Sequence, residues 1–344
     1  MIHTIQMYTS LTKREKACIE RYYRKSLYFI IKEIEEIFKE HDITLNLKKF
    51  SATDTYNLYL ETDVIKLLKK QDGVITEEDY SEADKIIHEI EQQLLLWELE
   101  RNFILIRIDY RLDVKVENEV QRKYLFKLWN KLAAKYYHMK KCNRPKVDTA
   151  HVESVPFETT IYFNSKSICV TVYDKEQERQ DKGIQAEEYE KNVLRFEVRL
   201  MNAHLKNMKS GKKREKTLEA YWKEEVYMSY MQKYVVRLFG TDPFYKIYYA
   251  RKMIRTSLYP EKEQQKLETF LTDISKYGVE GVIGYRTKLE WDYKQYSRYQ
   301  MRKYSRMLAQ LGINMILVPQ NEVAALGKIP NPLAIFRGVE MSKQ

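Results

Sequence analysis

The sequence predicts an α+β fold, in which an antiparallel sheet with flanking helices is followed by an all-helical C-terminal segment. Several stretches before residue 206 alternate apolar and polar residues, as half-buried strands do. From Thr217 onward the pattern is helical, with breaks at glycine and proline residues. Between Met201 and Leu258 there are 13 Lys and Arg residues against 5 Asp and Glu residues, so the composition changes where the strands end. We therefore predict two domains, residues 1–206 and residues 207–344.

The expected strands and helices follow from the spacing of the apolar residues. Residues 103–113 alternate, and residues 157–163 and 168–174 form a hairpin around the polar loop Asn164-Ser165-Lys166-Ser167. The other expected strands are residues 2–8, 42–48, 55–60 and 193–200. The expected helices before residue 206 are residues 13–40, 77–98, 117–137 and a polar helix at 184–191.

Charge and composition narrow the class of protein. A net charge of +11 and a pI near 9.1 favour a polyanionic partner, with nucleic acid ahead of a membrane surface. No apolar run reaches 18 residues, so we expect no membrane span, and the first ten residues lack the features of a signal peptide. The cysteines Cys18, Cys142 and Cys169 are odd in number and far apart, which argues against a disulfide framework or a cysteine zinc site. We expect a cytoplasmic protein.

Four of the expected strands place polar side chains on one face, because alternate residues of a strand point to the same side. The opposite side of each strand is apolar. If these strands share one antiparallel sheet, its open face carries acids, bases and a tyrosine. A solvated face with charges paired across strands gives the same pattern. The polar positions are Arg107, Asp109 and Arg111; Glu158, Thr160 and Tyr162; Thr171, Tyr173 and Lys175; and Arg195, Glu197 and Arg199.

The acids of this face are candidate metal ligands. Asp109, Glu158 and Glu197 would converge on one divalent cation if their strands are neighbours. Carboxylate oxygens suit Mg²⁺ or Mn²⁺. Such an ion would polarise a phosphodiester oxygen.

The remaining side chains of the face suggest a nucleophile and its support. Tyr173 would attack phosphorus, but a phenol has a pKa of about 10 and needs help to ionise. Lys175 would lower that pKa or neutralise charge on the phosphate. We expect Arg107, Arg195 and Arg199 to bind the DNA, where Arg107 and Arg195 would hold flanking phosphates.

These segments resemble the gene II/X family of rolling-circle replication initiators of filamentous phages and related plasmids. The order and approximate spacing of the segments agree over residues 1–206. The resemblance implies a replication-initiator nuclease-like fold and an endonuclease that starts rolling-circle replication. Residues 106–109 are similar to the family's R-I-D strand, 157–163 to its aromatic-E-[ST]-T-[IV] strand, 170–178 to its Y-x-K-x-x-E segment and 194–199 to its R-F-E-[AV]-R strand.

The resemblance also assigns roles to single residues. It implies that Tyr173 forms a 5′-phosphotyrosyl bond and leaves a free 3′-hydroxyl as primer. It implies a divalent metal held by Asp109 and Glu197, with Glu158 ranked ahead of Glu178 for the next place. Many tyrosine nickases hold their metal with a His-hydrophobic-His motif, and this sequence has no His-x-His. His151, near the Glu158 strand, is a further candidate ligand.

A basic helix is predicted near the C-terminus. Its basic residues recur at every fourth position, so they line one helix face, and tyrosines are interleaved with them. Basic residues neutralise phosphates, and tyrosine stacks on unpaired bases, so we predict that this face binds DNA. With the turn near residues 281–288 it would form a helix-turn-helix, although a solvated basic helix gives the same pattern. The basic residues are Lys294, Arg298, Arg302 and Arg306, and the buried side would be Met301, Leu308 and Leu311.

Together these observations predict a metal-dependent, site-specific single-strand DNA endonuclease and ligase that acts at a replication origin. Transesterification conserves the energy of the phosphodiester bond, so the nick can be resealed without ATP. The expected partners are origin DNA, both duplex and exposed single strand, and a host polymerase. A host helicase is implied because the sequence has no G-x-x-x-x-G-K-[ST] motif. A homodimer is left open.

Three alternatives interpret the same residues differently. A relaxase of a mobilisable element would share the chemistry, and the sequence does not separate it from a replication initiator. A non-catalytic origin-binding or regulatory protein would keep the basic helices, but the set Asp109, Tyr173 and Glu197 argues against it. An RNA-binding structural protein lacks any RNP-like motif. The pairs Tyr230/Tyr234 and Tyr245/Tyr249 have the spacing of two-tyrosine initiators and are expected to pack instead.

Overall fold

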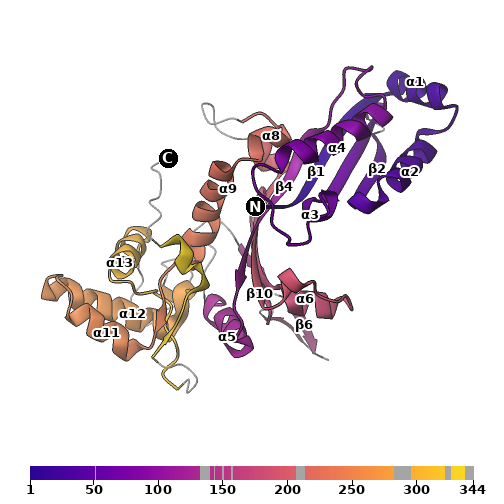
Figure 1. Ribbon diagram of the computed structural model, residues 1–344. Coiled ribbons are helices and arrows are strands. Elements are labelled where there is room, and N and C mark those ends of the chain that lie inside the picture. The colour runs from indigo at the N-terminus through magenta and orange to yellow at the C-terminus, as the bar shows by residue number, and fades with distance from the viewer. Residues whose placement is uncertain are drawn as a thin grey trace. The chain divides into compact units, whose positions relative to one another are not determined.

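The computed structural model describes residues 1–50, 52–131, 140–142, 144–148, 151–155, 158–206, 214–282, 296–321 and 327–337 (Figure 1). Within these residues, eight strands form one sheet in the order β2-β3-β1-β4-β10-β9-β8-β5. β1 pairs antiparallel with β3 and β4, β2 with β3, and β5 with β8. The predicted α+β class, with an antiparallel sheet followed by a helical C-terminal region, is confirmed.

The strands of this sheet are β1 (Ile2–Thr12), β2 (Ile43–Phe50), β3 (Thr55–Asp63), β4 (Ile104–Lys115), β5 (Lys140–Cys142), β8 (Thr160–Asn164), β9 (Ile168–Asp174) and β10 (Val193–Met201). Two further pairs are β6 (Arg144–Asp148) with β7 (His151–Val155), and β11 (Phe244–Tyr245) with β12 (Lys328–Ile329). Each predicted strand corresponds to one of the sheet strands. β9 covers the predicted residues, whereas β8 begins three residues later than predicted.

The α-helices are α1 (Lys13–Tyr23), α2 (Leu27–Ile37), α3 (Val64–Leu67), α4 (Tyr80–Gln93), α5 (Glu119–Trp129), α6 (Lys175–Asp181), α7 (Asn202–Lys206), α8 (Leu218–Tyr221), α9 (Glu224–Tyr230), α10 (Arg237–Phe239), α11 (Ile247–Arg255), α12 (Glu261–Val282) and α13 (Arg298–Gln310). Short 3₁₀ turns are η1 (Lys39–His41), η3 (Glu188–Glu190) and η5 (Pro332–Phe336). A π-helical turn, η4 (Met231–Val236), follows α9. In the described part of the chain, no helix combines the length and apolar character needed to cross a membrane.

Several predicted helical elements differ from the structure. The predicted helix at 13–40 is divided, because Arg24 adopts a left-handed conformation (φ 54°) and its N–H bonds back to the last turn of α1. The polar helix predicted at 184–191 is wrong. The helix instead begins at Lys175, because the Asp174 side chain accepts a hydrogen bond from the Gln177 N–H and so caps α6. The C-terminal region also contains the β11–β12 pair, so it is not entirely helical.

The chain forms two compact units. The first contains residues 1–112, 166–169 and 197–231, and the second contains residues 113–165, 170–196 and 232–344. The strands β4, β9 and β10 contribute residues to both. The predicted boundary at residue 206 is a division along the sequence, and it stays a prediction.

In the first unit, the apolar side of the strands is buried under helices. Ile5, Met7 and Leu11 of β1 and Leu58 and Leu60 of β3 are at most 4% exposed, and the residues between them are mostly half-buried. α1 packs against β1, and α2 against β2 (Figure 1). The other side of the strands is therefore left for polar and charged side chains.

The second unit has an aromatic core. The indole of Trp129 is fully buried and makes edge-to-face contacts with Phe126, Phe196 and Phe239, at centroid distances of 5.9, 5.5 and 5.4 Å. Phe163 packs on Phe239 at 5.9 Å. Because these rings come from α5, β8, β10 and α10, one cluster joins strands to the helical C-terminal region.

Truncating this indole should strongly destabilise the protein. We expect Trp129→Ala to lower the free energy of unfolding by about 3–5 kcal/mol, because the lost ring leaves a large cavity among aromatic neighbours. Trp97→Ala is the matched control, since Trp97 is 63% exposed, and its cost should stay below about 1 kcal/mol. Urea unfolding followed by circular dichroism measures both. Equal costs would contradict the aromatic cluster as the centre of this core.

Candidate functional site

The first unit holds a histidine between two carboxylates on the polar side of its strands. His3 Nε2 lies 3.3 Å from Asp63 Oδ2, and His3 Nδ1 lies 3.0 Å from Glu197 Oε1. The side chains are 18%, 22% and 9% exposed, so solvent screens them only partly. Each ring nitrogen of His3 thus faces a carboxylate oxygen, so the imidazole lies between Asp63 and Glu197.

A β-bulge places His3 in this position. Ile2 pairs with Tyr110 of β4, but Thr4 pairs with the adjacent Asp109, so His3 is the extra residue of β1. On its other side, β1 pairs Thr4 with Asp63. Bulges redirect a side chain locally and are frequent next to functional sites.

The pKa of the Asp63 carboxyl is shifted by its surroundings. Burial raises the pKa of its carboxyl. The hydrogen bond and charge of His3, the backbone N–H of Ile65 and the charge of Arg111 oppose this and lower the pKa from 3.8 to about 2. Asp63 is therefore ionised at neutral pH and contributes to the stability of the folded state.

Asp109, a predicted metal ligand, is held by two arginines. Arg107 Nε donates to Oδ1 at 2.9 Å and a terminal nitrogen donates to Oδ2 at 2.6 Å. Arg199 Nε lies 3.2 and 3.0 Å from the same two oxygens. Asp109 is only 1% exposed, so this buried carboxylate orients two predicted DNA-binding guanidinium groups. A metal ion on Asp109 would have to displace at least one of them.

The formal charges of the site leave room for one more positive charge. The side chains concerned, which we call the His3 cluster, contain four carboxylates and three guanidinium groups, so the acids exceed the arginines by one. A bound cation would balance this excess. The members of the His3 cluster are His3, Glu61, Asp63, Arg107, Asp109, Arg111, Glu197 and Arg199.

The donor set tests whether a divalent cation suits the His3 cluster. Carboxylates and an imidazole nitrogen are ligands of Mn²⁺, and carboxylates of Mg²⁺. However, among the residues that the structure describes, no three His, Cys, Asp or Glu side chains are grouped around one point as metal ligands would be. The donor atoms of His3, Asp63 and Glu197 therefore suit a metal ion by their chemistry. Their arrangement differs from that of a metal site, because the imidazole lies between the two carboxylates.

The predicted nucleophile and its lysine lie in the second unit. Tyr173, near the end of β9, is 9% exposed, and Lys175 Nζ lies 5.8 Å from the centroid of its ring. Lys175 is itself 4% exposed, and its Nζ lies 2.8 Å from Glu178 Oε2 and 3.4 Å from Glu190 Oε1. The structure therefore brings Tyr173 and Lys175 together as predicted, but from a strand and a helix rather than from one strand.

The surroundings of Lys175 change its protonation. Burial lowers the pKa of its ammonium group, and the nearby charge of Arg195 lowers it further. Glu178 and Glu190 oppose both effects without cancelling them. A lysine with a lowered pKa can accept a proton from a phenol more readily than a solvated one, so the pair Tyr173–Lys175 suits nucleophilic chemistry.

Two buried ion pairs lie beside Tyr173 and Lys175. Glu190 is 1% exposed and accepts two hydrogen bonds from Arg179, at 2.8 and 2.7 Å. Arg195 is 1% exposed and makes a bidentate pair with Asp113, at 2.7 and 2.9 Å. The polar side of β10 is thus enclosed at Arg195, where the sequence predicted an open face. A phosphate bound by Arg195 would have to compete with Asp113.

The other predicted ligands are Glu158, Glu178 and His151. Glu158 is exposed in the bend that precedes β8, in the second unit. Glu178 lies in α6 and contacts Lys175 and Lys182, which agrees with the prediction that it lies beyond the Tyr173 strand. The side chain of His151 lies outside the described residues. Whether Glu158 joins Asp109 and Glu197 at one metal stays a prediction.

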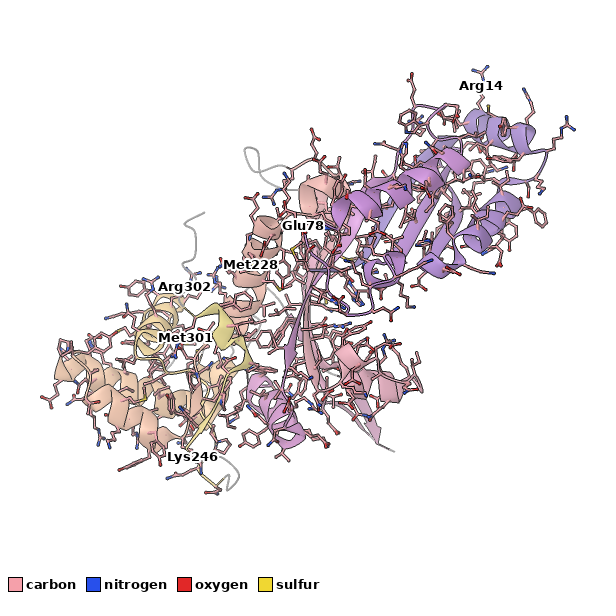
Figure 2. The ribbon with its side chains drawn as sticks, viewed as in Figure 1. Arg14, Glu78, Met228, Lys246, Met301 and Arg302 are labelled. Carbon is pink, nitrogen blue, oxygen red and sulfur yellow. The ribbon has the colours of Figure 1, made fainter. Side chains whose placement is uncertain are left out.

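The predicted basic helix is α13. Arg298, Arg302 and Arg306 are exposed, and no ion pair with them is found in the described part of the chain. Tyr299 is 75% exposed beside them. Met301 and Leu308 are buried as predicted, and the neighbours Met301 and Arg302 on α13 can be seen in Figure 2. Lys294 and most of the predicted turn at 281–288 lie outside the described residues.

The tyrosines with the spacing of two-tyrosine initiators lie in the packed helical part of the chain and beside Gly327. The Tyr230 hydroxyl lies 2.8 Å from His204 Nε2, and its ring stacks on Tyr110 at 5.6 Å. Tyr234 belongs to the π-helical turn. Tyr249 is 48% exposed and lies against Gly327. The packing of Tyr230 agrees with the expectation that this residue is structural.

Comparisons with known proteins find a family similar to part of the chain. Residues 119–225 match the family model for the N-terminal region of the phage replication-associated gene II protein, a range that contains Tyr173, Lys175 and Glu197. The match confirms the family predicted from the motifs. A structure of a rolling-circle replication initiator protein from Geobacillus stearothermophilus is similar at 9% identity and a TM-score of 0.28, over 92% of this chain and 98% of that chain. No curated protein matches the chain.

The lowered pKa of Asp63 predicts a pH-dependent contribution to stability. This contribution is present above the ordinary pKa of 3.8 and is lost as the pH falls towards the folded-state pKa of about 2. We expect Asp63→Asn to lower the free energy of unfolding by about 2 kcal/mol at neutral pH, and by roughly half as much near pH 3. Urea unfolding at both pH values measures this.

The exposed Glu40→Gln is the control for this measurement, and it should cost little at either pH. A loss in Asp63→Asn that is the same at both pH values would contradict an ionised Asp63 beside His3.

Proposed function

We propose that this chain, which over residues 119–225 belongs to the family of the phage replication-associated gene II protein, initiates rolling-circle replication by nicking one strand of its origin DNA. The observation that carries the proposal is the placement of Tyr173 beside the buried Lys175, within the range that matches the family. The matching family is that of a replication-associated protein, which favours an initiator over a relaxase. No observation favours the non-catalytic alternative.

The proposed reaction is a transesterification at phosphorus. The Tyr173 phenol loses its proton to neutral Lys175 or to solvent, and the phenolate oxygen attacks the phosphorus. The bond from phosphorus to the 3′ oxygen breaks, and that oxygen takes up a proton and becomes a free 3′-hydroxyl. The 5′ phosphate remains esterified to Tyr173. Because one phosphodiester replaces another, the reverse reaction reseals the strand without ATP.

Lys175 contributes in either protonation state. As a neutral amine it accepts the phenolic proton, and as an ammonium group it stabilises negative charge on the phosphorane. Glu178 and Glu190 hold its Nζ at 2.8 and 3.4 Å, so its position does not depend on substrate. This fixed geometry is the form of preorganisation that speeds charge-developing reactions.

The arginines of the His3 cluster are proposed to bind phosphates. Asp109 holds the guanidinium groups of Arg107 and Arg199 in position. The Arg199 side chain remains 37% exposed, so it can contact a ligand from solvent. The Arg107 side chain is only 19% exposed, so we expect it to move less than that of Arg199 when a ligand binds. A backbone phosphate of the DNA carries one negative charge and matches the planar donors of such a pair.

A divalent cation, Mg²⁺ or Mn²⁺, remains part of the proposal. We keep Glu197 as a ligand and add His3 and Asp63, because their donor atoms suit such an ion and because the His3 cluster has one excess negative charge. When bound, the ion would supply Lewis-acid polarisation of a phosphodiester oxygen. Asp109 and Glu158 as ligands, a host helicase and polymerase as partners, and a homodimer stay predictions.

Removing the nucleophile tests the proposal most directly. We expect Tyr173→Phe to lose the covalent DNA–protein adduct on supercoiled plasmid that carries the element's own origin, in the presence of Mn²⁺. The loss should be at least about a thousandfold, since the phenylalanine ring cannot form the ester. Tyr162→Phe, a half-buried tyrosine of β8 in the same unit, is the matched control and should retain the adduct.

An adduct that persists in Tyr173→Phe would move the nucleophile to another tyrosine. Tight origin binding without nicking, in wild type and under any metal, would favour the non-catalytic alternative.

The arginines of α13 predict a change in the salt dependence of DNA binding. Replacing Arg298, Arg302 and Arg306 together by glutamine removes up to three phosphate contacts. The slope of log K against log salt concentration should then become shallower by up to about 2–3, at about 0.7–0.9 for each contact. Fluorescence anisotropy at several salt concentrations measures the slope. Arg255→Gln is the control, because Arg255 is exposed but already paired with Glu268, and an unchanged slope in the triple variant would contradict DNA binding by α13.

A further inference from the structure

Two tyrosines form a pair on the polar side of the first unit's strands. Tyr8 of β1 and Tyr59 of β3 are directly opposite in the strand register. Their ring centroids are 6.0 Å apart and the ring planes differ by 27°. Both side chains are half-buried, so part of each ring is open to solvent.

Lysines and an exposed isoleucine surround this pair. Lys48 Nζ lies 5.5 Å from the centroid of Tyr59, and Lys216 Nζ lies 6.0 Å from that of Tyr8. A hydrogen bond of 2.9 Å to Asn202 holds the Lys216 ammonium group. Ile104 of β4 pairs with Tyr8 and is 37% exposed. We call Tyr8, Tyr59, Lys48, Lys216 and Ile104 the tyrosine platform.

The tyrosine platform shares a face with the His3 cluster. Along β3, Tyr59, Glu61 and Asp63 are alternate residues, so their side chains point to the same side. Asp63 lies four positions after Tyr59, which corresponds to about 14 Å along a strand. A chain that bound at the His3 cluster and followed the strands would reach the tyrosine platform within a few nucleotides.

We propose that the tyrosine platform binds unpaired bases of single-stranded DNA, an inference that rests on the proposed function and extends it to a second contact site. Every base has a flat π face that stacks on an aromatic ring, whereas bases in a duplex are already stacked on one another. The platform therefore suits a separated strand rather than duplex DNA. Its selectivity for particular bases should be low, because stacking is tolerant of sequence.

The two lysines favour single-stranded DNA as the ligand of the tyrosine platform. Stacking of a base on an aromatic side chain is stronger than an exposed cation–π contact, so a base displaces the ammonium group from the ring. The displaced ammonium group of Lys48, whose side chain is exposed, then lies close to the sugar-phosphate backbone. A purely apolar protein partner would gain nothing from two ammonium groups over the rings, whereas a polyanion with flat bases uses both features.

Binding of a labelled oligothymidylate tests the proposal in the full chain with the Tyr173→Phe substitution, which keeps cleavage out of the measurement. Adding Tyr8→Leu or Tyr59→Leu should weaken binding by at least about fivefold, because leucine keeps an apolar side chain but has no π face. Tyr8→Phe and Tyr59→Phe should bind as well as the parent. Tyr22→Leu, an exposed tyrosine of α1, is the matched control and should have no effect.

Three outcomes would overturn the proposal. The first is binding that neither leucine variant alters, and the second is a loss in the phenylalanine variants as large as that in the leucine variants. The third is an equal loss for a duplex of the same length, which would show a non-specific effect on the protein. Thermal melting of each variant identifies a leucine variant that fails to fold, and the other position then decides. The proposed nicking function fails separately, if the wild-type chain binds its origin but neither nicks it nor forms a covalent adduct under any metal.

Discussion

The two-residue repeat of the antiparallel strands is the constraint on which the rest of the first unit depends. One side of β1 and β3 is buried under helices, so every second residue must be apolar. The residues between are free to be polar. Asp109 and Glu197 are nevertheless almost fully buried, and a buried charge is tolerated only when it is paired. The pairing partners, Arg107, Arg199 and His3, follow from this requirement.

The same requirement shapes the second unit. Lys175, Glu190 and Arg195 are at most 4% exposed, and each is paired with an opposite charge. Replacing such pairs by apolar residues often stabilises a protein, so their presence is better explained by the positions they impose than by stability. In this site they impose the position of an ammonium group near the ring of Tyr173. The ion pairs are therefore best understood as a framework for the proposed chemistry.

Much of the fold could be predicted because the signals are local. The bounds of β9 agree with the prediction at both ends, since its alternation and its flanking turn residues are contiguous in sequence. The motif order also led to Tyr173 and Lys175. The prediction grouped Lys175 with Tyr173 by continuing the alternation one residue past the strand, whereas Asp174 caps a helix that begins at Lys175. Sequence reasoning missed His3 and Asp63 as partners of Glu197, because their proximity depends on strand pairings between distant segments and on a bulge at His3.

A second bulge lies on β4. Gln6 pairs with Arg107 and Met7 pairs with Leu105, so Ile106 is an extra residue without a partner on β1. The bulge changes the parity of the strand, so even-numbered Ile104 shares a face with odd-numbered Arg107. The alternation of inside and outside thus shifts within a single strand. Gain or loss of one residue here would exchange the exposed set of side chains for the buried set on one side of the bulge. The number of residues at this point therefore matters more to the fold than the identity of a single side chain.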